Sequence, residues 1–141
     1  MTTELLAPAG GREALVAAVQ SGADAVYMGF GAFNARRSAR NFSDEEFRAA
    51  VSYCHLRGVK VYLTLNTLVT DRELPALADA ARVASECGVD AILVQDWGVL
   101  ATLQKIIPDV PLHASTQMSL HTLSGVKESA RLGMTRAVLA R

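Results

Sequence analysis

The chain has 141 residues, of which 50% are hydrophobic and 20% are charged, a composition typical of one globular domain rather than a disordered chain. The 14 Lys and Arg residues balance the 14 Asp and Glu residues, so net charge gives no general argument for binding nucleic acid or an anionic membrane. No apolar run approaches the roughly 20 residues of a membrane span, and the N-terminus lacks the pattern of a signal peptide. We therefore expect a cytoplasmic protein with no membrane partner, in which Cys54 and Cys87 are reduced thiols.

The first half of the chain alternates short apolar runs with helical patterns. A first strand is expected within residues 4–11 and a helix over 12–21, followed by strands over 25–28 and 61–65. The helix between these two strands begins after Ser43, because Ser43 and Glu46 have the spacing of a capping box. The intervening segment, residues 29–42, is longer than an ordinary βα loop, and such loops are often functional.

The second half continues the alternation. A helix beginning near residue 71 leads to a strand over 91–94, and a helix over about 97–107 is stopped by Pro108. A strand over 112–118, a helix capped by Ser119 or Thr122 and a last strand over 137–140 complete the chain.

One pattern recurs four times: a helix, a glycine and a buried strand, which in three of the four repeats ends near a polar residue. It spans residues 22–29 (GADAVYMG), 58–66 (GVKVYLTLN), 88–96 (GVDAILVQD) and 133–141 (GMTRAVLAR). Each glycine can end its helix in the left-handed conformation, and continuous apolar runs are typical of parallel strands that are buried on both faces. The repeats predict an α/β fold of parallel βα units.

Such units build either an open doubly wound sheet or a closed (β/α)8 barrel. No GxGxxG motif follows the first strand, which argues against a dinucleotide-binding open sheet.

Five short segments of this chain occur in the same order in one known family. They are residues 4–10 (ELLAPAG), 22–27 (GADAVY), 94–96 (VQD), 112–117 (LHASTQ) and 138–141 (VLAR). On these segments the chain resembles the N-terminal part of the collagenase-like peptidase family, family U32. The resemblance covers residues 4–141 and implies a TIM-like barrel, of which residues 1–141 would be the N-terminal part of a single domain holding strands one to six.

A barrel of six strands is incomplete, because closure requires two more. We therefore expect the 141 residues to be part of a longer protein and to be inactive alone. Open edges at the first and last strands would favour self-association.

The resemblance implies two activities with different substrates. Some members of the family are described as proteases that act on collagen-like proteins, and others hydroxylate a pyrimidine base in transfer or ribosomal RNA, with prephenate-derived chemistry and an iron–sulfur cluster. Residues 94–96 and 113–117 look nearer to the ribosomal-RNA branch. The family's cysteine-rich signature has no counterpart here, so no cofactor is expected within this segment, and an iron–sulfur cluster would belong to the part of the protein beyond it.

In a barrel the reacting groups project from the C-terminal ends of the strands and the loops that follow. Alternation along the fifth strand puts His113, Ser115 and Gln117 on one face, toward the mouth of the barrel. We assign catalytic roles to Asp96, His113 and Gln117. We assign substrate binding to a second set of polar residues, namely Arg36, Arg37, Asn66, Gln95, Ser115 and Arg141.

Each assignment has a structural alternative. The polar side chains of the fifth strand could satisfy one another inside the barrel, Asp96 could cap the helix that starts at Trp97, and Asn66 could shape a turn. Arg36, Arg37 and Arg40 could form an ordinary basic loop, or could hold a phosphate, an RNA or a carboxylate ligand. The last possibility supports a third function, a non-enzymatic RNA- or anion-binding module.

Two common kinds of hydrolytic site are not predicted. A serine hydrolase is disfavoured because the chain has no GxSxG elbow and no evident acid to orient His113 beside Ser115. No metal site is expected, because His55 and His121 fall on separate helices and there is no HExxH motif. The residues alone therefore favour neither peptide hydrolysis nor RNA hydroxylation.

Overall fold

The computed structural model describes residues 3–33 and 42–141. Within these ranges one sheet contains six strands in the order of the chain, namely β1 (Leu6–Pro8), β2 (Ala25–Gly29), β3 (Lys60–Leu65), β4 (Ala91–Val94), β5 (Leu112–Ala114) and β6 (Arg136–Ala137). The helices between them are α1 (Arg12–Gln20), α2 (Asp44–His55), α3 (Leu74–Glu86), α4 (Trp97–Ile106), the 3-10 helix η1 (Thr116–Met118) and α5 (Leu123–Arg131).

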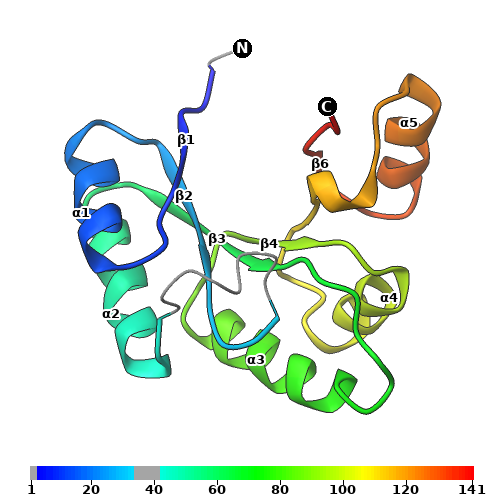
Figure 1. Ribbon diagram of the computed structural model, residues 1–141, viewed down its shortest axis with the longest axis horizontal. Coiled ribbons are helices and arrows are strands. Elements are labelled where there is room, and N and C mark those ends of the chain that lie inside the picture. Colours follow the sequence, from blue (N-terminus) through cyan, green and yellow to red (C-terminus); the bar gives the residue numbers. More distant parts are fainter. Residues whose placement is uncertain (1–2, 34–41) are drawn as a thin grey trace.

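All neighbouring strands are parallel, and the helices lie along the outer side of a curled sheet (Figure 1). This arrangement is a TIM-like half-barrel, because each crossover returns the chain to the next position in a curling sheet. The predicted α/β fold, with the first six strands of a barrel, is confirmed. No helix in the described ranges is long and apolar enough to cross a membrane.

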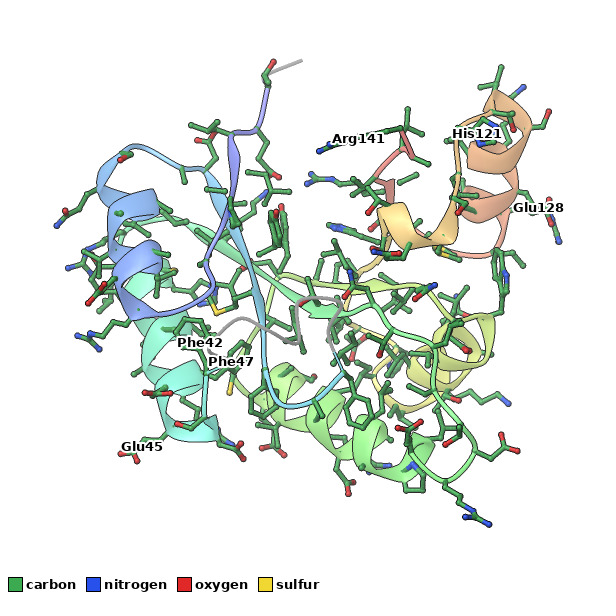
Figure 2. All side chains as sticks on the ribbon, in the orientation of Figure 1. Phe42, Glu45, Phe47, His121, Glu128 and Arg141 are labelled. Carbon is green, nitrogen blue, oxygen red and sulfur yellow. The ribbon has the colours of Figure 1, made fainter. Side chains whose placement is uncertain are left out.

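The curl divides the apolar side chains into two cores. The outer core lies between sheet and helices and includes Phe47 and Leu63, both fully buried. Figure 2 shows Phe47 pointing from α2 into the molecule, whereas Glu45 of the same helix points away from it. The inner core lies on the concave face and consists of Ala25, Tyr62, Ala91 and Leu93, with Leu6, Tyr27 and Val138 packed against it. Strand alternation therefore assigns each side chain to one core or the other.

Four glycines set the turn from helix to strand. Gly22, Gly58, Gly88 and Gly133 have φ of 90°, 71°, 79° and 90°. In all four turns the residue after the glycine donates its N–H to the carbonyl five positions earlier, as in Val59 to Cys54 at 3.0 Å. This is the Schellman arrangement, in which the left-handed residue satisfies carbonyls that the helix end leaves free. The predicted role of the four glycines is confirmed.

The second residue after the glycine then joins its strand to the strand before it. Asp24 Oδ2 accepts from the Leu5 N–H at 2.7 Å, and Asp90 Oδ2 accepts from the Val61 N–H at 2.7 Å. At the equivalent place in the last repeat, Thr135 Oγ1 donates to the Leu112 carbonyl at 3.4 Å. These contacts fix where neighbouring strands begin relative to one another.

The strand predicted over residues 112–118 is wrong beyond Ala114. The Ser115 N–H still donates to the Val94 carbonyl at 2.9 Å, but its hydroxyl caps η1, and the residue after η1, Ser119, lies in the left-handed region with φ of 59°. The last strand is also shorter than predicted and covers Arg136–Ala137. The chain then turns toward the loop after η1, where the Ala140 N–H donates to the Leu120 carbonyl at 2.7 Å. The capping box of Ser43 and Glu46 and the cap at Thr122 are confirmed.

The aspartates that join neighbouring strands are expected to stabilise the fold. Replacing Asp90 by Ala removes a charge-assisted hydrogen bond to the Val61 N–H and should lower the free energy of unfolding by about 1–2 kcal/mol. Urea denaturation monitored by circular dichroism measures this change. The matched control is Asp109→Ala, at an exposed aspartate between α4 and β5. Equal stability of the two variants would contradict a joining role for Asp90.

Candidate functional site

Polar side chains gather where β3, β4 and β5 end, and we call this region the mouth of the half-barrel. Asn66 follows β3, Gln95 follows β4 and Ser115 follows β5. The Asn66 side-chain Nδ2 donates to Ser115 Oγ at 3.0 Å, which links the ends of two strands that β4 separates. Ser115 is only 2% exposed, so this hydrogen bond is held inside the protein rather than in solvent. Asn66, Gln95 and Ser115, expected together from the sequence, thus all lie at the same end of the sheet.

Gln117 is placed differently from its predicted position. It lies on η1 and is exposed, because the strand has already ended, and its backbone N–H donates to Ser115 Oγ at 3.4 Å. The prediction that Gln117 shares a strand face with His113 and Ser115 is therefore wrong. A sequence signal for this exists, since a serine two residues before Gln117 can cap a short helix as readily as it can extend a strand.

Asp96 caps α4, as the structural alternative proposed. Its Oδ1 accepts from the Gly98 N–H at 2.7 Å and from the Val99 N–H at 3.0 Å. The catalytic assignment of Asp96 stays a prediction, although its carboxylate already accepts two hydrogen bonds from the N-terminus of α4. Arg141 is exposed at the end of the chain (Figure 2). Arg36, Arg37 and Arg40 lie outside the described residues.

His113 faces the concave side of the sheet and is 6% exposed. Its ring makes an edge contact with the Tyr62 ring, with centroids 5.0 Å apart and planes at 73°. The pKa of His113 is lowered from 6.5 to about 4, chiefly by burial, with Arg136 and Lys60 acting in the same direction and Glu4 in the opposite one. His113 is therefore neutral at pH 7.

Toward the other end of the strands lies a group that we call the inner ion cluster: Glu4, Lys60, Tyr62 and Arg136. The Tyr62 hydroxyl donates to the Glu4 carboxylate at 2.9 Å, and Arg136 Nη1 donates to Glu4 Oε1. Lys60 Nζ lies 3.5 Å from Glu4 Oε2. The Arg136 hydrogen bond holds the pKa of Glu4 below its usual range, and the same contact raises the pKa of Arg136. The sequence analysis missed this cluster, because Glu4 and Arg136 are 132 positions apart and carry no local motif.

The mouth contains hydrogen-bonding side chains but no side-chain nucleophile that is hydrogen-bonded to a general base among the described residues. Within residues 3–33 and 42–141 no hydrogen bond joins His113 to Ser115, whose Oγ instead accepts from Asn66 Nδ2 and the Gln117 N–H. Thr67, next to Asn66, has a buried hydroxyl oxygen with no partner in the same ranges.

Cysteine chemistry and metal binding find no support in the described part of the chain. Burial raises the pKa of the fully buried Cys54 thiol to about 11, so this thiol is a poor nucleophile and a poor ligand. No group of three or more His, Cys, Asp or Glu residues in this part is placed to hold a metal ion.

Residues 10–141 match the family model described as Peptidase family U32. Over 140 residues the chain is 41% identical to the 23S rRNA 5-hydroxycytidine C2501 synthase of Escherichia coli (strain K12), covering 98% of this chain and 20% of that protein. It is 37% identical to the tRNA hydroxylation protein P1 of Bacillus subtilis (strain 168) and 34% identical to a collagenase of Porphyromonas gingivalis, covering 98% of this chain and 33% of each relative. The chain thus spans a fifth to a third of the length of these relatives.

Among solved structures, the U32 peptidase Mk0906 is similar to this chain with a TM-score of 0.75 and 17% sequence identity. The similarity covers 98% of this chain and 58% of that one. At this level of identity the match supports the half-barrel fold alone.

The pKa of His113 predicts how stability depends on pH. Between pH 6.5 and about 4 the unfolded chain binds a proton that the folded chain excludes, so the free energy of unfolding should fall as the pH decreases through this window. The loss attributable to this ring is at most about 3 kcal/mol. Urea denaturation at several pH values should show a shallower dependence for His113→Gln than for the wild type. His121→Gln, at an exposed histidine, is the control and should leave the dependence unchanged.

Proposed function

Because this chain belongs to peptidase family U32, we propose that it supplies a substrate-contacting half-barrel to an enzyme that hydroxylates a pyrimidine base in RNA. The proposal rests on the uncharged hydrogen-bonding groups at the mouth. Asn66, Gln95 and Ser115 bring amide and hydroxyl groups to the ends of three adjacent strands, and the neutral His113 lies deeper on the same concave face.

Neutral donors and acceptors suit the recognition of a base. Proteins read an unstacked base by hydrogen bonds to its polar edge, and enzymes that modify a base take it out of the stack into a pocket. Asn and Gln amides provide a donor and an acceptor side by side, which matches the edge of a pyrimidine. The 41% identity to a ribosomal-RNA hydroxycytidine synthase supports the same assignment.

The iron–sulfur cluster associated with the RNA-modifying branch does not fit the residues of this chain. A cluster is held by several cysteine thiolates, whereas this sequence has 2 cysteines. Cys54 is buried on α2 with a raised pKa, and Cys87 follows α3 on the outer side of the sheet. We therefore assign no step of the reaction through a cluster to these residues.

Peptide-bond hydrolysis is the second candidate, and the 34% identity to a collagenase favours it. Against it, the Ser115 hydroxyl accepts hydrogen bonds from Asn66 and Gln117 rather than donating to a general base, and the Cys54 thiol is buried. A peptidase built on this half-barrel would have to draw its nucleophile or metal from other residues.

Nucleoside analysis of RNA from a deletion strain tests the proposal. Mass spectrometry of digested ribosomal and transfer RNA should show the loss of a hydroxylated pyrimidine, and the full-length gene should restore it. A Ser115→Ala gene should restore it only in part, because the variant loses the contact with Asn66 at the mouth. The matched control is Ser124→Ala, at an exposed serine of α5.

The deletion strain and the purified full-length protein together distinguish the three candidate functions. An unchanged nucleoside profile would exclude RNA hydroxylation, and cleavage of gelatin by the purified full-length protein would then establish the peptidase. RNA binding without either activity would establish the non-enzymatic binding module.

A further inference from the structure

We propose that His113 is a specificity-determining residue that hydrogen-bonds, as a neutral imidazole, to a pyrimidine base entering the mouth, and that Glu4, Tyr62 and Arg136 are positioning residues that hold its ring in place. The base as ligand rests on the function proposed above, whereas the positioning role rests on the contacts of the inner ion cluster alone. The inference is drawn from four features of His113, namely its depth, its unused hydrogen-bonding groups, its packing and its electrostatic surroundings.

His113 lies beneath the mouth. It precedes Ser115 by two residues on the concave side, which places it about 6–7 Å deeper along the strand direction than the hydroxyl that Asn66 contacts. A base that reaches past Asn66 and Ser115 therefore meets the imidazole next.

The imidazole has hydrogen-bonding groups that the described protein does not use. Neither ring nitrogen is hydrogen-bonded to a residue in the ranges 3–33 and 42–141, although the side chain is only 6% exposed. In these ranges the only fully buried side-chain N or O atom without a partner is Thr67 Oγ1, so the ring nitrogens of His113 are not sealed off and can be reached by a ligand. A neutral imidazole presents one donor and one acceptor, which suits the edge of a base.

The ring is held from two sides. On β3, the Tyr62 ring packs against it and is itself fixed, because its hydroxyl donates to both oxygens of the Glu4 carboxylate. On β6, Arg136 is the register partner of His113 and hydrogen-bonds to the same carboxylate. Glu4 is thus the common partner of the two residues that flank His113, from β3 and from β6.

The surrounding charges favour the neutral ring. The charged and titratable groups that act on His113 are Arg136, Lys60 and Glu4, with Tyr62 in contact, and two of these four groups are cations. Burial and both cations lower the pKa of His113, while Glu4 acts in the opposite direction. The ring is therefore suited to hydrogen bonding at neutral pH and unsuited to act as a general base that must hold a proton.

Nuclear magnetic resonance of the His113 ring nitrogens in the full-length protein tests the positioning role. The wild-type ring should titrate near pH 4, Arg136→Gln should raise the pKa, and Glu4→Gln should lower it. Arg136→Lys keeps the positive charge and should leave the pKa of His113 close to the wild-type value. If Arg136→Gln does not fold, Glu4→Gln and Arg136→Lys still test the role. The control pair is Glu128→Gln and Arg131→Gln, an exposed ion pair on α5 that should not affect His113. Figure 2 shows Glu128 on the outer side of α5. A wild-type pKa near 6.5, or no response to Arg136→Gln and Glu4→Gln, would overturn the positioning role.

Binding of two RNA probes tests the ligand. Hexacytidine should bind the full-length protein more tightly than an abasic hexamer of equal length and charge, since both share the phosphate contribution. His113→Phe should reduce this difference about tenfold, and His113→Gln should recover most of it, because an amide keeps a donor and an acceptor. Equal loss in both variants would overturn the hydrogen-bonding role. If the preference for hexacytidine depends on His113 but the deletion strain has normal RNA modification, base binding by His113 is supported and RNA hydroxylation is not. The failure of the proposed function is therefore distinguishable from the failure of this inference.

Discussion

The left-handed glycine that ends α1, α2, α3 and α5 is the constraint on which the half-barrel depends. A helix that packs on the outside of the sheet must reverse direction within two residues to enter the next strand, and a residue with φ near 70–90° allows this. The amide after each glycine returns to the helix, and the next residue often reaches sideways to the previous strand, as Asp24 and Asp90 do. Helix end, strand start and strand register are therefore set in one short segment, and the repetition of that segment builds the sheet.

The curl of the sheet separates the ends of the strands into two regions with different chemistry. Near the beginnings of the strands, one carboxylate, Glu4, is shared by Tyr62, Lys60 and Arg136, which ties the segment before β1 to β3 and β6. Near the ends of the strands, Asn66, Gln95 and Ser115 present neutral polar groups. In TIM barrels the first region generally serves stability and the second carries function. His113 lies between them, with its ring against Tyr62 and its backbone two residues from Ser115.

The family includes relatives named for RNA hydroxylation and for collagen cleavage, so function has to be argued from the site rather than from the fold. Of the potential nucleophiles near the sheet, the Ser115 hydroxyl is engaged by two N–H donors and the Cys54 thiol is buried. A site of neutral amides, hydroxyls and an uncharged imidazole recognises a ligand through hydrogen bonds. This chemistry is the basis of our proposal that the half-barrel contacts a base rather than attacks a peptide bond.

The sequence alone determined the features that are encoded over a few neighbouring residues. The four helix-ending glycines, the buried strands that follow them and the caps at Ser43, Asp96 and Thr122 all depend on local backbone and side-chain geometry, which the chain specifies within one turn. Asn66, Gln95 and Ser115 could be placed at one mouth because parallel strands end at the same edge.

Only the tertiary structure decided the rest. The strand predicted through residue 118 ends at Ala114, because the Ser115 hydroxyl, with Asn66 as partner from another strand, caps a 3-10 turn instead. The inner ion cluster exists because the curl brings together residues 132 positions apart. The neutral state of His113 depends chiefly on its burial on the concave face of the same curled sheet. Contacts of that kind leave no periodic or local signal, since they depend on the curvature of the whole sheet rather than on any segment of the chain.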